Sequence, residues 1–106
     1  MELLHLSDEN FKQNVLDKKG VVVVDFFATW CGPCRMLSPV LEQVQEEMEG
    51  KITIVKLDVD EGENTAKQYG IMSVPSMVVF KDGEEIDRLV GFKSKDALVE
   101  YFSKLS

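Results

Sequence analysis

The chain has 106 residues, of which 44% are hydrophobic, and its formal net charge is −7 at pH 7. This length suits a single domain, residues 1–106, with a sizeable core, and the acidic charge argues against nucleic acid or an anionic membrane surface as a partner. The only two cysteines, Cys31 and Cys34, stand too close together to cross-link distant parts of a fold, which excludes a secreted disulfide scaffold. Since neither a signal-peptide pattern nor a membrane span is visible, we expect a cytoplasmic protein, or an organellar one if a presequence has been removed.

Apolar patterns in the first quarter of the chain predict two strands and a helix between them. A short strand at 2–6 precedes a helix from about 8 to 18, with Ser7 as its cap and Gly20 at its end. The run at 21–28 begins with four valines and is typical of a central strand that is covered on both faces.

The rest of the chain predicts three more helices and three more strands. The helix that opens at about Arg35 should end near Gly50 and be kinked by Pro39. The later elements are a strand at 51–59, a helix at 63–69, strands at 74–80 and 84–90 joined by Lys81-Asp82-Gly83, and a last helix capped by Ser94. This order predicts an α/β fold whose mixed sheet is parallel at the helical crossovers, antiparallel at the closing hairpin, and covered by helices on both faces.

The run Cys31-Gly32-Pro33-Cys34 stands where the predicted central strand turns into the next helix. A Cys-x-x-Cys pair in that position is typical of thiol–disulfide exchange. One cysteine lies at the helix N-terminus, where unpaired N–H groups and the helix dipole favour its thiolate, and the other lies one turn along. A purely structural disulfide is a poor alternative because it would restrain almost no chain. A zinc site is a poor alternative too, because His5 is the only histidine and four good ligands are lacking.

Asp25 lies inside the apolar strand that precedes the cysteines. Burial disfavours an anionic carboxylate, so the pKa of Asp25 should be raised. The carboxylate could act as a general base that takes the proton of Cys34, or it could form a buried ion pair with Lys56. Composition alone leaves these two interpretations equal.

Trp30-Cys31-Gly32-Pro33-Cys34, with Asp25 five residues before its tryptophan, resembles the active-site sequence of the thioredoxin family. The resemblance covers essentially the whole chain, and its further matching positions are Lys56, Asp60, Val74-Pro75, Lys81-Asp82-Gly83 and Gly91. It implies a thioredoxin-like fold, with a central mixed five-stranded sheet flanked by four helices. One departure is Phe27, at a position where many thioredoxins carry a second tryptophan, so a polar contact of an indole N–H is missing there.

The resemblance also implies roles for single residues. It makes Cys31 the nucleophile and Cys34 the resolving thiol, and it favours the proton-relay role of Asp25, tuned by Lys56. Bonds before proline are usually trans, but the resemblance implies a cis Pro75 that faces the disulfide. The implied redox tuning comes from Gly32 and Pro33, and the implied apolar docking surface consists of Trp30, Gly32, Pro33, Ile71, Met72, Val74, Pro75 and Gly91. Taken singly, Ile71 and Met72 could be ordinary packing residues.

The implied function is that of a general protein-disulfide reductase, an electron carrier that works by reversible dithiol–disulfide exchange. The sequence has no flavin or dinucleotide motif, so we expect no bound cofactor or metal, and electrons from a thioredoxin reductase that uses NADPH or ferredoxin. The expected partners of this monomer are that reductase and disulfide-containing proteins.

Two alternative functions stay open. One is a disulfide oxidase or isomerase of the same fold, although oxidising relatives usually carry a histidine just before the second cysteine. The other is a binding subunit that uses the docking surface without chemistry.

Overall fold

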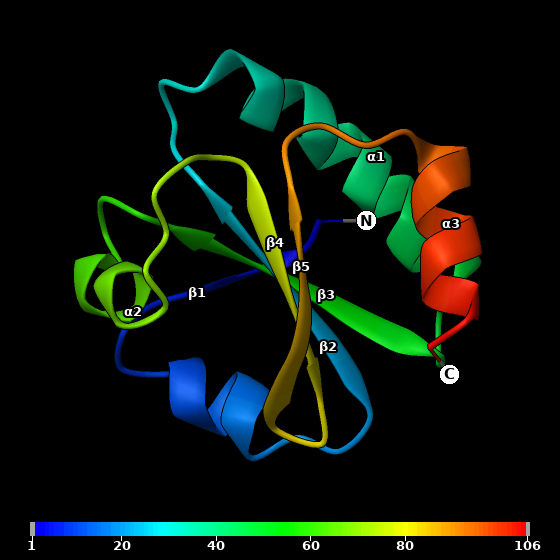
Figure 1. The fold of residues 1–106 in the computed structure, drawn as a ribbon, viewed down its shortest axis with the longest axis horizontal. Helices are drawn as coiled ribbons and strands as arrows, with labels where there is room; N and C mark the ends of the chain where they lie inside the picture. Colours follow the sequence, from blue (N-terminus) through cyan, green and yellow to red (C-terminus); the bar gives the residue numbers. More distant parts are fainter. Residues whose placement is uncertain (1, 106) are drawn as a thin grey trace.

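Five strands form one mixed sheet in the computed structural model, which describes residues 2–105 (Figure 1). Across the sheet the strands lie in the order β1 (Leu4–Leu6), β3 (Ile52–Asp58), β2 (Val21–Phe27), β4 (Ser76–Lys81) and β5 (Glu84–Val90). The first three are parallel, and β4 and β5 run antiparallel to their neighbours. The expected mixed sheet, with an antiparallel closing hairpin, is therefore confirmed.

The central strand β2 is buried along its whole length, because helices cover both faces of the sheet. On one face Val21 and Val23 pack with α1 (Gly32–Glu47) and α3 (Lys95–Ser103), whose buried side chains include Leu37, Leu41, Val44, Leu98 and Phe102. On the other face the alternate residues of β2 pack with η1 (Lys12–Leu16) and α2 (Glu63–Gln68). Figure 1 shows these two helix pairs on opposite sides of the sheet. The uninterrupted valine run is thus explained, since successive side chains enter two different cores.

The Asp-Gly hairpin between β4 and β5 is also confirmed. Asp82 and Gly83 both have positive φ angles, 51° and 84°, as a two-residue turn that matches the twist of its strands requires. The turn is held to the start of β2, because the backbone N–H of Gly20 donates to Oδ1 of Asp82 at 2.7 Å. A β-carbon on Gly83 would lie 2.3 Å from the carbonyl oxygen of Leu16, so this turn also packs tightly against the end of η1.

The prediction of a helix at 8–18 with a Ser7 cap was wrong in extent and in kind. Only Lys12–Leu16 is regular, as a π-helix, and turns occupy the residues before Phe11. Ser7 uses its backbone rather than its hydroxyl, because its N–H donates to Oδ1 of Asn10 at 2.7 Å. Asn10 in turn accepts the side-chain amide of Asn14 on its carbonyl oxygen. Further along, the N–H of Asp17 donates to the carbonyl oxygen of Lys12 at 2.9 Å, which is the i→i−5 bond of a π-helix, and apolar periodicity does not distinguish this bond from an α-helical one.

Several element boundaries differ by one to three residues from the expected ones. The helix expected from Arg35 already begins at Gly32, because Pro33 fits the first turn, where its missing N–H costs nothing. The strand expected from Val74 begins at Ser76, and the strand expected over 51–59 covers Ile52–Asp58. The capping role of Ser94 is confirmed, since its Oγ accepts the N–H of Ala97 at 3.2 Å. Pro39 does lie inside α1, and a kink there stays a prediction.

Within residues 2–105, no helix combines the length and the apolar character that crossing a membrane requires.

Candidate redox-active site

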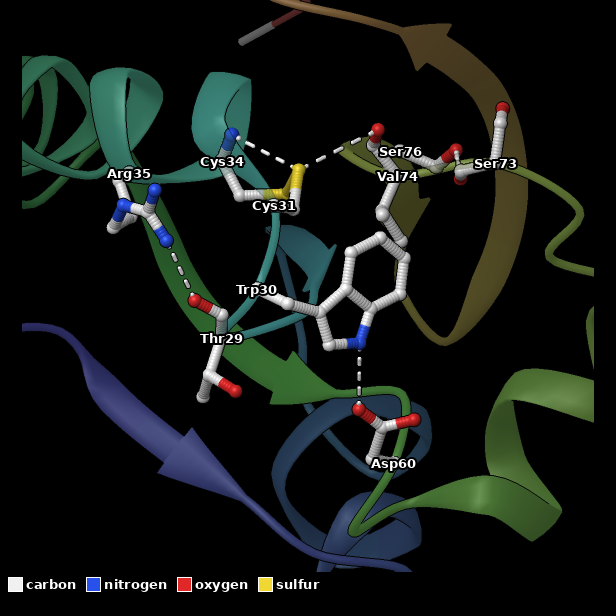
Figure 2. Close-up of a disulfide and its surroundings, with 9 residues drawn as sticks. All are labelled: Thr29, Trp30, Cys31, Cys34, Arg35, Asp60, Ser73, Val74 and Ser76. Atoms are coloured by element: carbon white, nitrogen blue, oxygen red, sulfur yellow. Dashed lines mark hydrogen bonds between the residues drawn. A yellow bond between two sulfur atoms is a disulfide. The ribbon is translucent and has the colours of Figure 1, made fainter.

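Cys31 and Cys34 form a disulfide at the junction between β2 and α1, with their α-carbons 5.3 Å apart (Figure 2). Cys31 is the N-cap of α1 in an extended conformation, and its Sγ accepts the backbone N–H of Cys34 at 3.2 Å. A sulfur at this position receives one of the unpaired N–H groups of the first helical turn. The N-terminus of a helix is in general a position that favours negative charge on a side chain.

The two cysteines differ in surroundings rather than in exposure. Their exposed fractions in this disulfide form are 5% for Cys31 and 3% for Cys34. The Sγ of Cys31 lies 3.7 Å from the carbonyl oxygen of Val74, in the segment that leads into β4. Cys34 instead lines a hollow of about 470 Å³ together with Phe27, Ser38 and Lys56. The sulfur of Cys31 therefore lies beside the segment that leads into β4, and Cys34 contributes to a hollow that Ser38 and Lys56 also line.

Asp25 is completely buried, and neither of its carboxylate oxygens has a hydrogen-bond partner among residues 2–105. It stands in β2 between Lys56 of β3 and Met77 of β4 in the sheet register. Burial raises the pKa of Asp25 to about 7, and the nearby Lys56 ammonium opposes this rise without cancelling it. A carboxylate in this position can hold or release a proton near neutral pH.

Lys56 does not pair with Asp25. Its ammonium donates to the Oγ of Ser38 at 2.7 Å and lies 4.4 Å from the centre of the Phe27 ring. Within residues 2–105, no ion pair joins Lys56 to a carboxylate. The buried ion pair considered as an alternative role for Asp25 is thus not formed in this structure. Phe27, at the position where many thioredoxins carry a tryptophan, gives the ammonium an aromatic face.

Sequence reasoning missed Ser38. It follows Cys34 by four residues, which places both side chains on the same face of α1. Nothing in the sequence pairs it with Lys56, because that contact depends on how α1 lies across β3. Sequence reasoning also matched Asp60 to the family without giving it a role, although Asp60 Oδ2 accepts the indole N–H of Trp30 at 3.1 Å (Figure 2).

The residues predicted to form a docking surface come together around the disulfide, with unequal exposure. Trp30 is 68% exposed and Met72 is 95% exposed, and both line a hollow of about 170 Å³ with Val59, Ile71, Ser73 and Val74. Half-buried Ile71 also packs on the core below, as the packing alternative considered for it predicts, and its docking role stays a prediction.

Pro75 and Gly91 lie at the edge of this surface. The Val74–Pro75 bond is cis, as the family resemblance implied. Pro75 itself is buried, and its carbonyl oxygen accepts the N–H of Gly91 at 2.8 Å. Gly91 has a φ of 88°, a conformation that favours glycine. Pro75 therefore lies below the surface, and Val74 is the member of the pair that contacts the disulfide (Figure 2).

Comparisons with known proteins identify the family of the chain. Residues 2–104 match the sequence model of the thioredoxin family. The chain is 48% identical to a thioredoxin of Staphylococcus haemolyticus over 104 residues, which are 98% of this chain and 98% of that protein. Thioredoxins of Staphylococcus saprophyticus and Staphylococcus aureus match with the same identity and coverage. With its five-stranded mixed sheet and its Cys-x-x-Cys disulfide, the chain belongs to the thioredoxin family of dithiol–disulfide exchange reductases.

Proposed function

We propose that Cys31 attacks substrate disulfides and that Cys34 resolves the product. The observation that carries this assignment is the contrast between the two sulfurs, since Cys31 lies beside the exposed Val74 segment and accepts the N–H of Cys34, whereas Cys34 faces the hollow. In the first step the Cys31 thiolate forms a bond to one substrate sulfur, and the substrate disulfide breaks. In the second step Cys34 loses its proton and attacks Cys31, the mixed disulfide breaks, and the substrate leaves as a dithiol after taking up two protons.

The second step is fast because both of its sulfurs belong to one helical turn. The α-carbons of the cysteines lie only 5.3 Å apart, so Cys34 attacks at an effective concentration far above that of any free thiol. The mixed disulfide is then resolved before the released substrate thiol can reverse it. Gly32 and Pro33 between the cysteines set the redox properties of this ring.

Asp25 is the proton acceptor for Cys34 in this proposal, and Lys56 tunes it. A base works best when its pKa lies near the working pH, and the pKa of the buried Asp25 carboxyl is raised to about 7. Cys34 and Lys56 line one hollow, and Lys56 is the neighbour of Asp25 across β2 and β3. In this proposal the proton of Cys34 passes to the carboxylate directly or through water.

The surface around the disulfide is the proposed docking site for unfolded or loop segments of protein substrates. Trp30, Met72 and Val74 offer apolar contacts, and the backbone of Val74 offers hydrogen bonds close to Cys31. Gly91 supports this surface through Pro75, whose carbonyl oxygen it contacts. Exposed apolar groups of this kind mark interaction sites on small proteins.

We further propose a single-domain, monomeric, cytoplasmic electron carrier without a bound cofactor, which a thioredoxin reductase re-reduces with electrons from NADPH or ferredoxin. The test combines the purified chain, a protein disulfide substrate and either an NADPH-dependent or a ferredoxin-dependent reductase. Sustained reduction of the substrate with one reductase is expected, and Cys31→Ser serves as the inactive control. If both reductases fail while the chain instead oxidises reduced substrate proteins, the chain is an oxidase and the proposal is wrong.

A further inference from the structure

The ammonium of Lys56 is buried next to a carboxylate but is bonded to a hydroxyl. Lys56 is 8% exposed and stands directly opposite Asp25 in the register of β2 and β3. Its one hydrogen bond within the described chain goes to Ser38 Oγ at 2.7 Å. Both oxygens of Asp25 remain without a hydrogen-bond partner in the part of the chain that the structure describes. A buried cation and a buried anion attract each other strongly at short range, so an ammonium without another partner is drawn toward Asp25.

The position of Ser38 allows it to be that other partner. Ser38 lies one helical turn after Cys34, and both residues line the same hollow as Lys56. The Phe27 ring lies 4.4 Å from the ammonium and supports it from the β2 side. The ammonium is therefore placed between an aromatic face and a hydroxyl of α1.

The other charged or titratable groups around Asp25 do not replace Lys56 in this arrangement. From α1, Arg35 donates to the carbonyl oxygen of Thr29 at 2.9 Å, and Cys34 is in the disulfide. From the sheet, Asp58 lies two residues beyond Lys56 and accepts the N–H of Asp60, and His5 of β1 stacks edge-on with Phe27. β4 contributes the apolar Met77 opposite Asp25, and the buried residues of α3 are apolar too.

We propose that Ser38 is a positioning residue, whose hydroxyl holds the Lys56 ammonium at the hollow and out of hydrogen-bond distance of Asp25, so that both carboxylate oxygens stay free to accept the Cys34 proton. This inference rests on the proposed function of Asp25 as the base. Without the hydroxyl, the ammonium turns to the carboxylate and stabilises its charged form. Asp25 then becomes a weaker base.

The test measures the pKa of Asp25 directly, by carbon NMR of its carboxyl group during a pH titration of the oxidised protein. In Ser38→Ala the pKa of Asp25 should fall by about 1 or more, as expected when an opposite charge comes within about 4–6 Å of a carboxylate. Ser38→Thr keeps a hydroxyl at the same atom and should restore the parent value. Ser76→Ala is the matched control, because it removes another hydroxyl close to the site, which donates to the carbonyl oxygen of Ser73 at 2.6 Å (Figure 2), and it should leave the pKa of Asp25 unchanged.

A second comparison tests whether the effect passes through Lys56. In a Lys56→Gln background, Ser38→Ala should no longer lower the pKa of Asp25, because no ammonium remains to be released. An unchanged or raised pKa in Ser38→Ala would overturn the inference, and so would an equal fall with and without Lys56. Should Lys56→Gln fail to fold, the inference is decided by the pKa of Asp25 in the two variants at position 38, which should be lowered in Ser38→Ala and unchanged in Ser38→Thr.

The inference and the proposed function can fail separately. The pH profile of mixed-disulfide resolution should move to lower pH in Ser38→Ala, by the same amount as the pKa of Asp25. If the pKa falls but the profile stays where it is, Ser38 does position Lys56, and the role of Asp25 as the base is wrong. If the pKa stays unchanged while Asp25→Asn slows resolution, the base is right and the role of Ser38 is wrong.

Discussion

Asp25 and Lys56 are direct neighbours across β2 and β3, yet the ammonium is bonded to Ser38 and the carboxylate to nothing. Desolvation therefore dominates over charge pairing, which is why the pKa of Asp25 lies at about 7. A buried group with such a pKa makes both the stability and the chemistry of the protein depend on pH.

The stability of the oxidised protein should decline as the pH rises from about 4 to about 7. Because the folded pKa of Asp25, about 7, is above the unfolded value of about 3.9, the native state binds the proton more tightly. The stabilisation is complete below about pH 4, is lost as the pH rises toward about 7, and is gone above it. At about 1.4 kcal/mol per pKa unit, this amounts to roughly 4 kcal/mol. Asp25→Asn should abolish this decline and be more stable than the parent at pH 8, as measured by urea unfolding.

Asp8→Asn is a control, because Asp8 contributes a pH dependence of stability opposite in sign to that of Asp25. Hydrogen bonds from the side chain and backbone of Thr65 lower the pKa of Asp8. The stability that Asp8 contributes is therefore present above its unfolded pKa and is lost as the pH falls through its folded one. Asp8→Asn should thus destabilise the protein at neutral pH. If Asp25→Asn behaves in the same way and leaves the exchange rate unchanged, Asp25 is a structural residue and not a base.

The two cysteines should behave differently when each is replaced by serine. Cys34→Ser keeps the attacking thiolate but removes the resolving thiol, so mixed disulfides with substrate proteins should accumulate and be detected by mass spectrometry. Cys31→Ser should trap almost none, because Cys34 faces the hollow rather than the exposed Val74 segment. Equal trapping by both variants would show that the two sulfurs are equally accessible to substrates and would refute the assignment.

The hydrogen bond between Trp30 and Asp60 should fix the orientation of the Trp30 indole ring within the docking surface. Trp30 is the only tryptophan, so its fluorescence anisotropy reports on this side chain alone. Asp60→Ala removes the acceptor of the indole N–H, and the anisotropy decay should show a freer ring. The net value of such a bond is about 0.5–1.5 kcal/mol, so KM for a protein substrate should rise by up to about tenfold with little change in kcat. A large loss of kcat at an unchanged KM would instead place Asp60 in the chemistry.

Gly83→Ala should destabilise the protein more than Gly20→Ala. Both glycines have nearly the same φ, 84° and 83°, so both substitutions bear the cost of a left-handed conformation, about 1–2 kcal/mol. Only at Gly83 would the new β-carbon meet backbone, since it would lie 2.3 Å from the carbonyl oxygen of Leu16, whereas Gly20 has nothing within 4 Å. The clash should add about 1–3 kcal/mol, as at other overpacked sites. Equal unfolding midpoints in urea would show that the hairpin can move away from η1.

The amino-acid sequence by itself determined the features that depend on neighbours within a few residues. The valine run of β2, the Asp-Gly turn and the Ser94 cap each follow from local patterns, and all three are present as expected. The Cys-x-x-Cys pair at a strand–helix junction likewise needed no long-range information. The first helix was misjudged because apolar periodicity does not distinguish the i→i−5 bonds of a π-helix, such as that from Asp17 to Lys12, from α-helical ones.

Only the tertiary structure decided which distant groups meet at the site. The hydrogen bond between Lys56 and Ser38 joins residues that are 18 positions apart in the sequence, and the one between Trp30 and Asp60 joins residues 30 positions apart. The sulfur of Cys31 lies beside Val74, which is 43 positions away in the sequence. These contacts depend on the register of β3 against β2 and on the way α1 lies over the sheet. The register and the placement of α1 follow from the packing of the two hydrophobic cores, in which many residues each make a small part of the contacts. A buried lysine and a buried aspartate in adjacent strands suggest an ion pair, and only the position of α1 gives the lysine another partner.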